Sequence, residues 1–417
     1  MPHFFPSSSD FAGATKHWRD DLLAGLAVGV VALPLALGFG IATGTGAASG
    51  IITAIVAGFI AALFGGSRFQ VSGPTGAMTV VLVPIVESYG VSIIAVVGVL
   101  AGTLSILAGL LRLGNIFSRV PWSVLEGFTA GIGIVIALQQ IPLALDIEKP
   151  EGGNALIVAW KSFSSPSTSQ MHFHAVMMAI IAIFTMIISP RIFKNIPPSI
   201  VTVIFCTFVS MAFQLSVLEI GALPRSLPKP TLPTIPQESW LPVITSGFAV
   251  FALGAIESVL SGKVAESLAH SKEKIHQSNQ FDSNRELFGQ GLATVASATM
   301  GGIPATGAIA RTAVNVRSGA KTRLASMVHA TFLLLCILLL APIVGRIPES
   351  ALAGVLVITA LRMVKPSVLL EALVTTRRNA ITMVVTAIST VALDLIRAVI
   401  IGILIHYLLS KISRLNH

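Results

Sequence analysis

The chain has 417 residues, of which 54% are hydrophobic and only 11% are charged. Soluble domains carry about 25% charged residues, so this composition indicates an integral membrane protein. The formal net charge of +9 comes without a basic run interleaved with aromatic residues, which argues against nucleic-acid binding. Both cysteines, Cys206 and Cys336, lie in apolar stretches, which argues against a disulfide framework or a metal site.

Apolar stretches recur along the chain from residue 22 onward. A membrane-spanning helix needs about 20 apolar residues. The predicted spans are 22–43, 46–64, 91–113, 123–145, 173–190, 197–217, 243–268, 284–299, 322–343, 348–364, 377–393 and 395–411, and two shorter helices are predicted at 75–88 and 306–317. The sequence therefore predicts an all-α integral membrane fold with 14 transmembrane segments, seven in each half.

The polar segments divide the chain into five parts. Residues 1–21 form either an amphipathic helix on the membrane surface or a disordered tail. The remaining predicted parts are a first repeat at 22–217, a proline-rich extracellular linker at 218–242, a second repeat at 243–411 and a tail at 412–417. Lys and Arg are more frequent in the loops that lie inside if the N-terminus is cytoplasmic, so both termini of this multi-pass plasma-membrane protein are predicted to be cytoplasmic. An odd number of segments in each half makes the halves an inverted repeat.

One short motif occurs in each half. The first copy is QVSGPTGAM at 70–78 and the second is GGIPATGAIA at 301–310, so each has a proline followed by Thr-Gly-Ala. Proline and glycine interrupt helices. Inside a bilayer, an interrupted backbone is tolerated only where it is buried in protein or lines a wet cavity. Paired interruptions in the two halves of a membrane chain point to the binding site of a transporter.

These motifs predict an anion site between two half-helices that meet at mid-membrane. If Thr75 and Thr306 open helices there, each helix start presents unpaired N–H groups and about half a positive charge. Such ends bind anions without lysine or arginine. The predicted anion-binding residues are Thr75, Gly76, Ala77, Thr306, Gly307 and Ala308. The alternative is that the prolines only kink helices for packing.

Glu257 is the second candidate, because it lies near the middle of the span predicted at 243–268. A carboxylate at that depth is a functional hypothesis by default. Ser261 follows at i+4 on the same helical face. Together they offer three oxygens to a Na⁺ ion. Alternatively Glu257 carries a proton, or it is a protonated carboxyl bonded to a neighbouring helix.

Arg311 follows the second motif. It either adds positive potential to the anion site or reaches the membrane surface, and we favour the surface.

Five segments together resemble the SulP family of anion transporters. They are ALPLALGFG at 32–40, FGGSRFQVSGPTGAMTVV at 64–81, GAIESVLSGKVAESLA at 254–269, GGIPATGAIARTAVNVRSGAKT at 301–322 and DLIRAVIIGILI at 394–405. The first helix and GPTGAMTVV are similar to the family's bicarbonate transporters. The resemblance implies a seven-plus-seven inverted repeat of the UraA type, with a core domain (segments 1–4 and 8–11), a gate domain (segments 5–7 and 12–14) and elevator-like movement.

The resemblance also implies roles for individual residues. In the bicarbonate transporters an acidic and a hydroxyl residue of the eighth segment bind Na⁺, and Glu257 and Ser261 occupy those positions. Those transporters have Asp in place of Glu257, which leaves H⁺ coupling open. They have a hydroxyl residue in place of Ile309, so one ligand of the coupling ion is expected to be lost. The family's anion contacts carry over to Thr75, Gly307 and Ala308.

The predicted function is secondary active transport of a small inorganic anion, bicarbonate or sulfate, in symport with Na⁺ or H⁺. The alternatives are an uncoupled anion channel or exchanger and a proton-coupled dicarboxylate carrier. No Walker motif or Gly-x-Ser-x-Gly motif occurs, so we expect neither an enzyme nor a cofactor other than Na⁺ as coupling ion. Family members usually continue into a STAS domain, which this chain is expected to lack. The expected partners are the anion, membrane lipid and a second copy in a homodimer.

Overall fold

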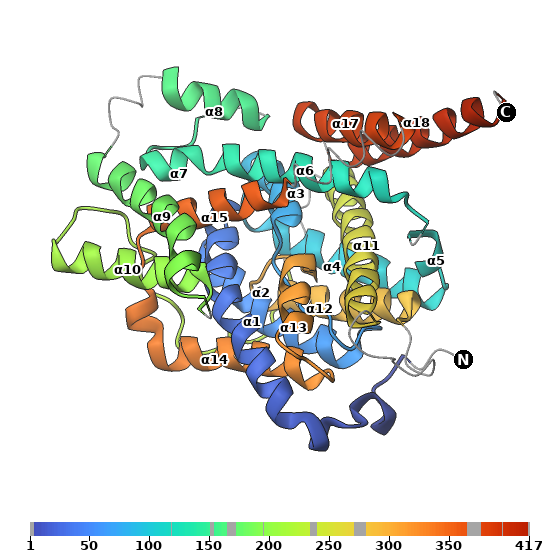
Figure 1. Ribbon diagram of the computed structural model, residues 1–417, viewed down its shortest axis with the longest axis horizontal. Helices are drawn as coiled ribbons and strands as arrows, with labels where there is room; N and C mark the ends of the chain where they lie inside the picture. The colour runs from blue at the N-terminus through green and yellow to red at the C-terminus, as the bar shows by residue number, and fades with distance from the viewer. Residues whose placement is uncertain are drawn as a thin grey trace. The chain divides into compact units, whose positions relative to one another are not determined.

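A computed structural model describes residues 4–117, 119–150, 154–164, 172–194, 196–233, 240–270, 281–364, 377–393 and 395–415. In this part of the chain the regular secondary structure consists of helices and of two strands of two residues each (Figure 1). The chain divides into two compact units, each built from both halves of the sequence. Unit 1 comprises residues 1–118 and 220–346, and unit 2 comprises residues 119–219 and 347–417.

Unit 1 contains both interrupted motifs. Its elements are η1 (Ser8–Phe11), α1 (Ala14–Ala42), α2 (Ala47–Phe64), β1 (Ser72–Gly73), α3 (Gly76–Tyr89), α4 (Ile93–Leu110), α5 (Gly114–Phe117), α11 (Trp240–His270), α12 (Ser283–Thr299), β2 (Thr306–Gly307), α13 (Ile309–Arg317) and α14 (Leu324–Val344). Helix α12 packs against α4 and α2, and α1 packs against α14 and α2. A Cβ on Gly102 of α4 would lie 2.8 Å from the carbonyl oxygen of Gly291 in α12, so small residues allow these backbones to approach closely.

Unit 2 consists of helices only in its described part. They are α6 (Trp122–Gln139), α7 (Ile141–Leu145), α8 (Ala155–Ser164), α9 (Phe173–Ile192), α10 (Pro198–Ala212), α15 (Glu349–Met363), α17 (Arg377–Ala392) and α18 (Leu395–Leu415). Helix α17 packs against α6 and α18, and α15 packs against α9 and α6. Helix α8 lies between the spans that the sequence predicts at 123–145 and 173–190. It buries Val158, Ala159 and Ser162 and exposes Trp160. Its 10 residues are too few to be predicted as a membrane-spanning helix, which needs about 20.

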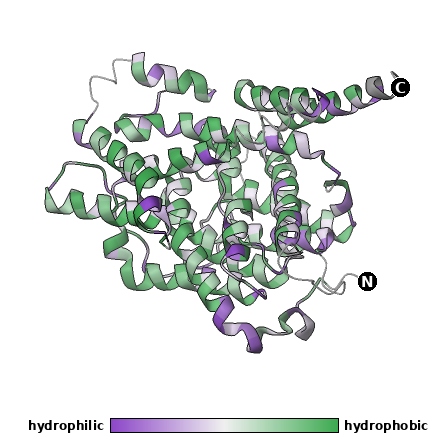
Figure 2. Cartoon of the chain, viewed as in Figure 1, coloured by the Kyte–Doolittle hydropathy of each residue, from purple (hydrophilic) through white to green (hydrophobic). Residues whose placement is uncertain are grey.

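Seven helices of the described chain are long and apolar enough to cross a membrane. They cover Ala14–Ala42, Ala47–Phe64, Ile93–Leu110, Trp122–Leu145, Phe173–Ile192, Trp240–Ala269 and Leu324–Val344. Shorter apolar helices include α3 and α10, and hydrophobic residues dominate most helices (Figure 2). The chain is therefore a multi-pass membrane protein with an all-helical fold, and the count of 14 segments stays a prediction.

The N-terminal residues comprise a short segment and the first turns of α1, which begins at Ala14. Residues 4–13, which we call the N-terminal strap, pack against unit 1. The ring of Phe4 lies 5.0 Å from that of Phe288, and the ring of Phe5 lies 6.0 Å from Phe288 and 6.5 Å from Phe64. The strap is thus attached to the ends of α2 and α12 by aromatic contacts.

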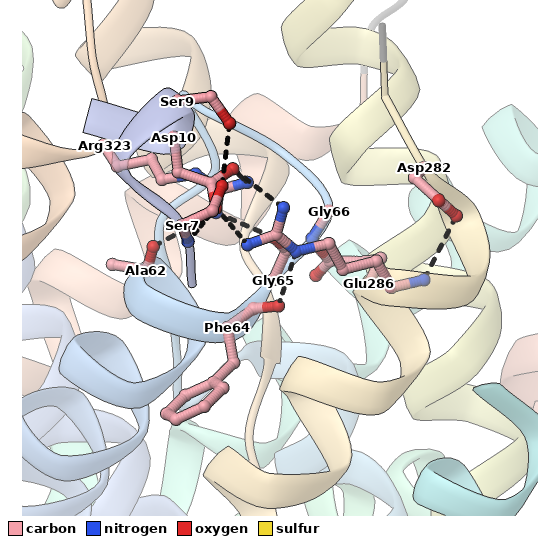
Figure 3. Close-up of polar contacts among 11 residues, drawn as sticks. Ser7, Ser9, Asp10, Ala62, Phe64, Gly65, Gly66, Asp282, Glu286 and Arg323 are labelled. Carbon is pink, nitrogen blue, oxygen red and sulfur yellow. Dashed lines mark hydrogen bonds and ion pairs between the residues drawn. The ribbon is translucent and has the colours of Figure 1, made fainter. Parts of the chain in front are cut away.

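Asp10 attaches the strap a second time, through charge. Arg285 donates from Nη1 and Nη2 to the two carboxylate oxygens of Asp10, each at 2.8 Å. Arg323 Nη2 lies 3.5 Å from the same carboxylate (Figure 3). Burial by itself raises the pKa of Asp10, but the bonds from Arg285 and the Ser7 N–H and the charges of both arginines lower the pKa to about 2. Asp10 is therefore ionised at neutral pH.

The same arginines hold the last turn of α2. Arg285 Nε donates to the carbonyl oxygen of Phe64 at 3.3 Å. Arg323 Nη1 donates to the carbonyl oxygens of Ala62 at 3.2 Å and Gly65 at 2.7 Å. A helix end leaves such carbonyl groups unpaired and carries a partial negative charge, which two guanidinium groups offset. The strap therefore holds in place the arginines that fix the loop leading to β1.

We expect Asp10→Asn to lower the melting temperature of the detergent-solubilised protein by several degrees. The substitution leaves two buried guanidinium groups without a carboxylate, at a cost of about 1–3 kcal/mol. The matched control is Asp20→Asn, because Asp20 is half exposed and its carboxylate lies 3.5 Å from His17; this variant should melt as the wild type does. The measurement is thermal unfolding followed by intrinsic fluorescence.

The pH dependence follows from the lowered pKa. The contribution of Asp10 is fully present above its ordinary pKa of 3.8 and is lost as the pH falls toward about 2. The melting-temperature difference between the wild type and Asp10→Asn should therefore be constant from about pH 5 to pH 8. A difference that disappears within this range would contradict the assignment.

Candidate functional site

The two interrupted motifs meet in a short antiparallel pair of strands. Ser72 pairs with Gly307 and Gly73 pairs with Thr306. The N–H of Ala308 also donates to the carbonyl oxygen of Val71 at 2.8 Å. Backbone groups that the interrupted helices leave unpaired must find partners inside a membrane protein. Here each motif supplies partners for the other.

The second half-helix begins later than the sequence predicts. Helix α3 begins at Gly76, directly after Thr75, as predicted, and the Thr75 hydroxyl accepts from the N–H of Met78 at 3.3 Å. The prediction that Thr306 opens a helix is wrong, because Thr306 lies in β2 and α13 begins at Ile309. The strand pairing uses the backbone at 306–307 before the helix starts.

The start of α13 at Ile309 instead of Thr306 changes which backbone N–H groups can bind an anion. The N–H of Gly307 donates to the Ser258 hydroxyl at 3.1 Å, and that of Ala308 donates to the carbonyl oxygen of Val71, directly before β1. Both predicted donors are thus already paired within the protein. The first N–H groups of a helix have no partner inside that helix. At α3 these belong to Gly76 and Ala77, and at α13 they begin with Ile309.

Three side chains join the two motifs to α11. Glu257 Oε2 accepts from the Thr75 hydroxyl at 2.9 Å and from the Thr306 hydroxyl at 2.7 Å. The two hydroxyl oxygens lie 3.0 Å from each other. Both threonines are buried, whereas Glu257 is half-buried. We call Thr75, Glu257 and Thr306 the Thr–Glu–Thr trio. It is a compact group of hard oxygen atoms, the kind of ligand that small hard cations take in proteins.

Ser261 contacts a residue of α13. Its hydroxyl lies 3.3 Å from the hydroxyl of Thr312 in α13. Thr312 in turn accepts from the N–H of Val71 at 3.0 Å. Ser261 therefore braces α13 and the segment before β1. The predicted pairing of Ser261 with Glu257 around a coupling ion stays a prediction.

Arg311 lies inside unit 1. The expectation that it reaches the membrane surface is wrong, because only 2% of it is exposed. Its Nη2 donates to the carbonyl oxygen of Pro74 at 2.6 Å, and its Nη1 has no hydrogen-bond partner in the described structure. The late start of α13 places Arg311 in the first turn of that helix, where it connects the second motif to the first. It also brings a buried positive charge near the trio.

A second group of buried polar residues supports β1 and escaped the sequence analysis. Gln70 Nε2 donates to Glu286 Oε1 at 2.8 Å, and the Ser72 hydroxyl donates to Gln290 Oε1 at 2.9 Å. Glu286 and Gln290 lie one helical turn apart in α12. Two long polar side chains at i, i+4 in a predicted span are a signal that would have identified the polar face of α12.

The model of the sulfate permease family matches residues 18–386, which is most of the chain. The chain belongs to the sulfate permease (SulP) family. The resemblance inferred from five sequence segments is therefore confirmed.

Relatives of known name lie within this family. The putative sulfate transporter YvdB of Bacillus subtilis is 33% identical, over 96% of this chain and 76% of its own length. The bicarbonate transporter BicA of a Picosynechococcus strain is 32% identical, over 96% of this chain and 71% of its own length. The solved transmembrane domain of a cyanobacterial BicA superposes with a TM-score of 0.84 at 31% identity, over 92% of this chain and 98% of that domain. The SulP transmembrane fold is thus shown.

We expect Gly73→Ala to lower the melting temperature and to reduce transport. A Cβ at Gly73 would lie 2.7 Å from Arg311 Nη1 and 3.3 Å from the Cα of Ala54, so β1 or Arg311 must move. Overpacking of this kind costs about 1–3 kcal/mol. The matched control is Gly254→Ala in α11, whose Cβ would meet Thr306 and Met78 only at 3.6 and 3.8 Å. If both variants melt at the wild-type temperature, the tight packing of β1 is wrong.

Proposed function

We propose that the chain is a secondary active transporter that carries a small inorganic anion, sulfate or bicarbonate, across the plasma membrane together with a cation. The observation that carries the proposal is the Thr–Glu–Thr trio at the junction of two interrupted helices. A carboxylate beside two helix starts gives one compact place where a cation and an anion can both bind. The names of the relatives support sulfate and bicarbonate as the anions to test.

The anion would bind at the first turns of α3 and α13. Both helix starts carry a partial positive charge and N–H groups without partners inside their helices. Gly76 and Ala77 are small, which lets an anion approach the backbone of α3. The buried guanidinium of Arg311 adds a full positive charge behind β1. These features favour a small anion over a bulky organic one.

The cation would bind at Glu257. An ionised carboxylate inside a membrane protein is costly unless a positive charge accompanies it. The hydroxyl oxygens of Thr75 and Thr306 lie close enough to share a Na⁺ ion with Glu257, and a proton on Glu257 would also neutralise it. An uncoupled channel or exchanger gains nothing from a carboxylate at this place. We therefore propose symport with Na⁺ or H⁺.

The two compact units fit an elevator mechanism. In this proposal unit 1, which contains every residue of the site, moves as one body and carries both ions across the membrane. The strap and its arginines would move with it, because all of them belong to unit 1. The distribution of Lys and Arg among the loops supports a cytoplasmic location for both termini.

Uptake into proteoliposomes tests the proposal. Labelled sulfate and labelled bicarbonate are offered separately, each with a Na⁺ gradient, with a pH gradient and with neither, and unlabelled fumarate serves as competitor. We expect one inorganic anion to accumulate with one of the two gradients. Equal uptake with and without both gradients would contradict symport, and inhibition by fumarate at micromolar concentration would favour a dicarboxylate carrier.

Variants of the trio tie transport to the site. Thr75→Val and Glu257→Ala should each reduce gradient-driven uptake by at least about tenfold, the factor that corresponds to about 1.4 kcal/mol. Thr79→Val is the matched control, because the buried Thr79 hydroxyl of α3 donates only to the backbone carbonyl oxygen of Thr75, at 3.1 Å, and not to Glu257. Wild-type uptake by Thr75→Val and Glu257→Ala would show that the site assignment is wrong.

A further inference from the structure

The hydroxyl hydrogens of the Thr–Glu–Thr trio are too few to serve the bare Glu257 carboxylate and a bound anion at once. Each threonine hydroxyl has one hydrogen to donate and accepts through its lone pairs. Thr75 and Thr306 lie 2.9 and 2.7 Å from the same carboxylate oxygen of Glu257, which as an ionised group only accepts. The Thr75 hydroxyl also accepts from the N–H of Met78, so its lone pairs are partly used.

This geometry limits anion binding while Glu257 carries no cation. An inorganic oxyanion needs hydrogen-bond donors, and bonds to charged acceptors are the strong ones. The bare carboxylate holds both hydroxyl hydrogens and also repels an approaching anion. The first N–H groups of α3 and α13 remain available to the anion, but the two threonines do not contribute.

We propose that Na⁺ binding at Glu257 turns the Thr75 and Thr306 hydroxyls, so that their oxygen lone pairs face Na⁺ and their hydrogens face the anion. This inference rests on the proposed function, with Na⁺ as the cation, and explains how one ion prepares the site for the other. It needs no movement of the backbone, because rotation about one side-chain bond redirects each hydroxyl hydrogen. Thr75 and Thr306 are then positioning residues that the two ions share.

Coupling between Na⁺ and the anion acts equally in both directions. If Na⁺ raises the affinity for the anion by some factor, the anion raises the affinity for Na⁺ by the same factor. Coupling between two sites is usually about 5- to 150-fold. Because two hydroxyls carry the coupling, loss of one hydroxyl should remove a large part of the factor while both ions still bind.

The experiment measures equilibrium binding of labelled sulfate and labelled bicarbonate to the 417-residue chain in detergent. Binding is measured at one fixed pH, with Na⁺ and with Na⁺ replaced by N-methylglucamine. The variants are Thr306→Val, Thr306→Ser, Glu257→Gln and, as matched control, the buried Thr79→Val. Melting temperatures confirm that each variant is folded before binding is compared.

We expect Na⁺ to raise the anion affinity of the wild type and of Thr79→Val at least about fivefold. Thr306→Val should lose most of this response, and Thr306→Ser, which keeps the hydroxyl, should retain it. Glu257→Gln should bind the anion without Na⁺ at least as tightly as the Na⁺-free wild type does, and should not respond to Na⁺.

Two results would overturn the shared-hydroxyl proposal and leave the proposed function intact. One is an anion affinity of the wild type that Na⁺ does not change although uptake responds to an ion gradient. The other is an unchanged Na⁺ response in Thr306→Val. If the folded wild type binds neither anion with or without Na⁺, the proposed function itself fails.

Discussion

Backbone polar groups cannot stay unpaired inside a bilayer, and the pairing of β1 with β2 satisfies this constraint at the two points where helices are interrupted. Everything at the site depends on this pairing. It brings Thr75 next to Thr306 although 231 residues separate them in sequence, and it lets one carboxylate of α11 bond both. It also sets where α13 starts, and thereby turns Arg311 inward.

The pairing needs support on both sides, and the chain supplies it with buried polar side chains. Gln290 and Glu286 of α12 hold the segment of β1, and Ser261 and Thr312 hold it from the side of α13. Farther from the site, the strap holds the arginines that bind the end of α2. The result is a rigid frame around a few donors and acceptors, which is what discrimination between small ions requires.

Part of this arrangement is visible in the sequence and part is not. The repeated Pro…Thr-Gly-Ala motif and the isolated Glu257 are local signals, and they suffice to predict two interruptions, the start of α3 and a charged group at the site. The start of α13, the burial of Arg311 and the bond between Asp10 and Arg285 arise from partners more than 200 residues away. No local pattern encodes such contacts, so the sequence alone misplaced Arg311 and gave no sign of the contacts that the strap makes.

The central claim is that two distant motifs form one site around Glu257, and a double-mutant cycle tests it most directly. Anion affinity is measured in Na⁺ for the wild type, Thr75→Val, Thr306→Val and the double variant. Residues that share one network are non-additive by about 0.5–3 kcal/mol. We predict that the double variant loses less affinity than the sum of the single losses by an amount in this range. Additivity within about 0.3 kcal/mol would show that the threonines act independently and would contradict the account.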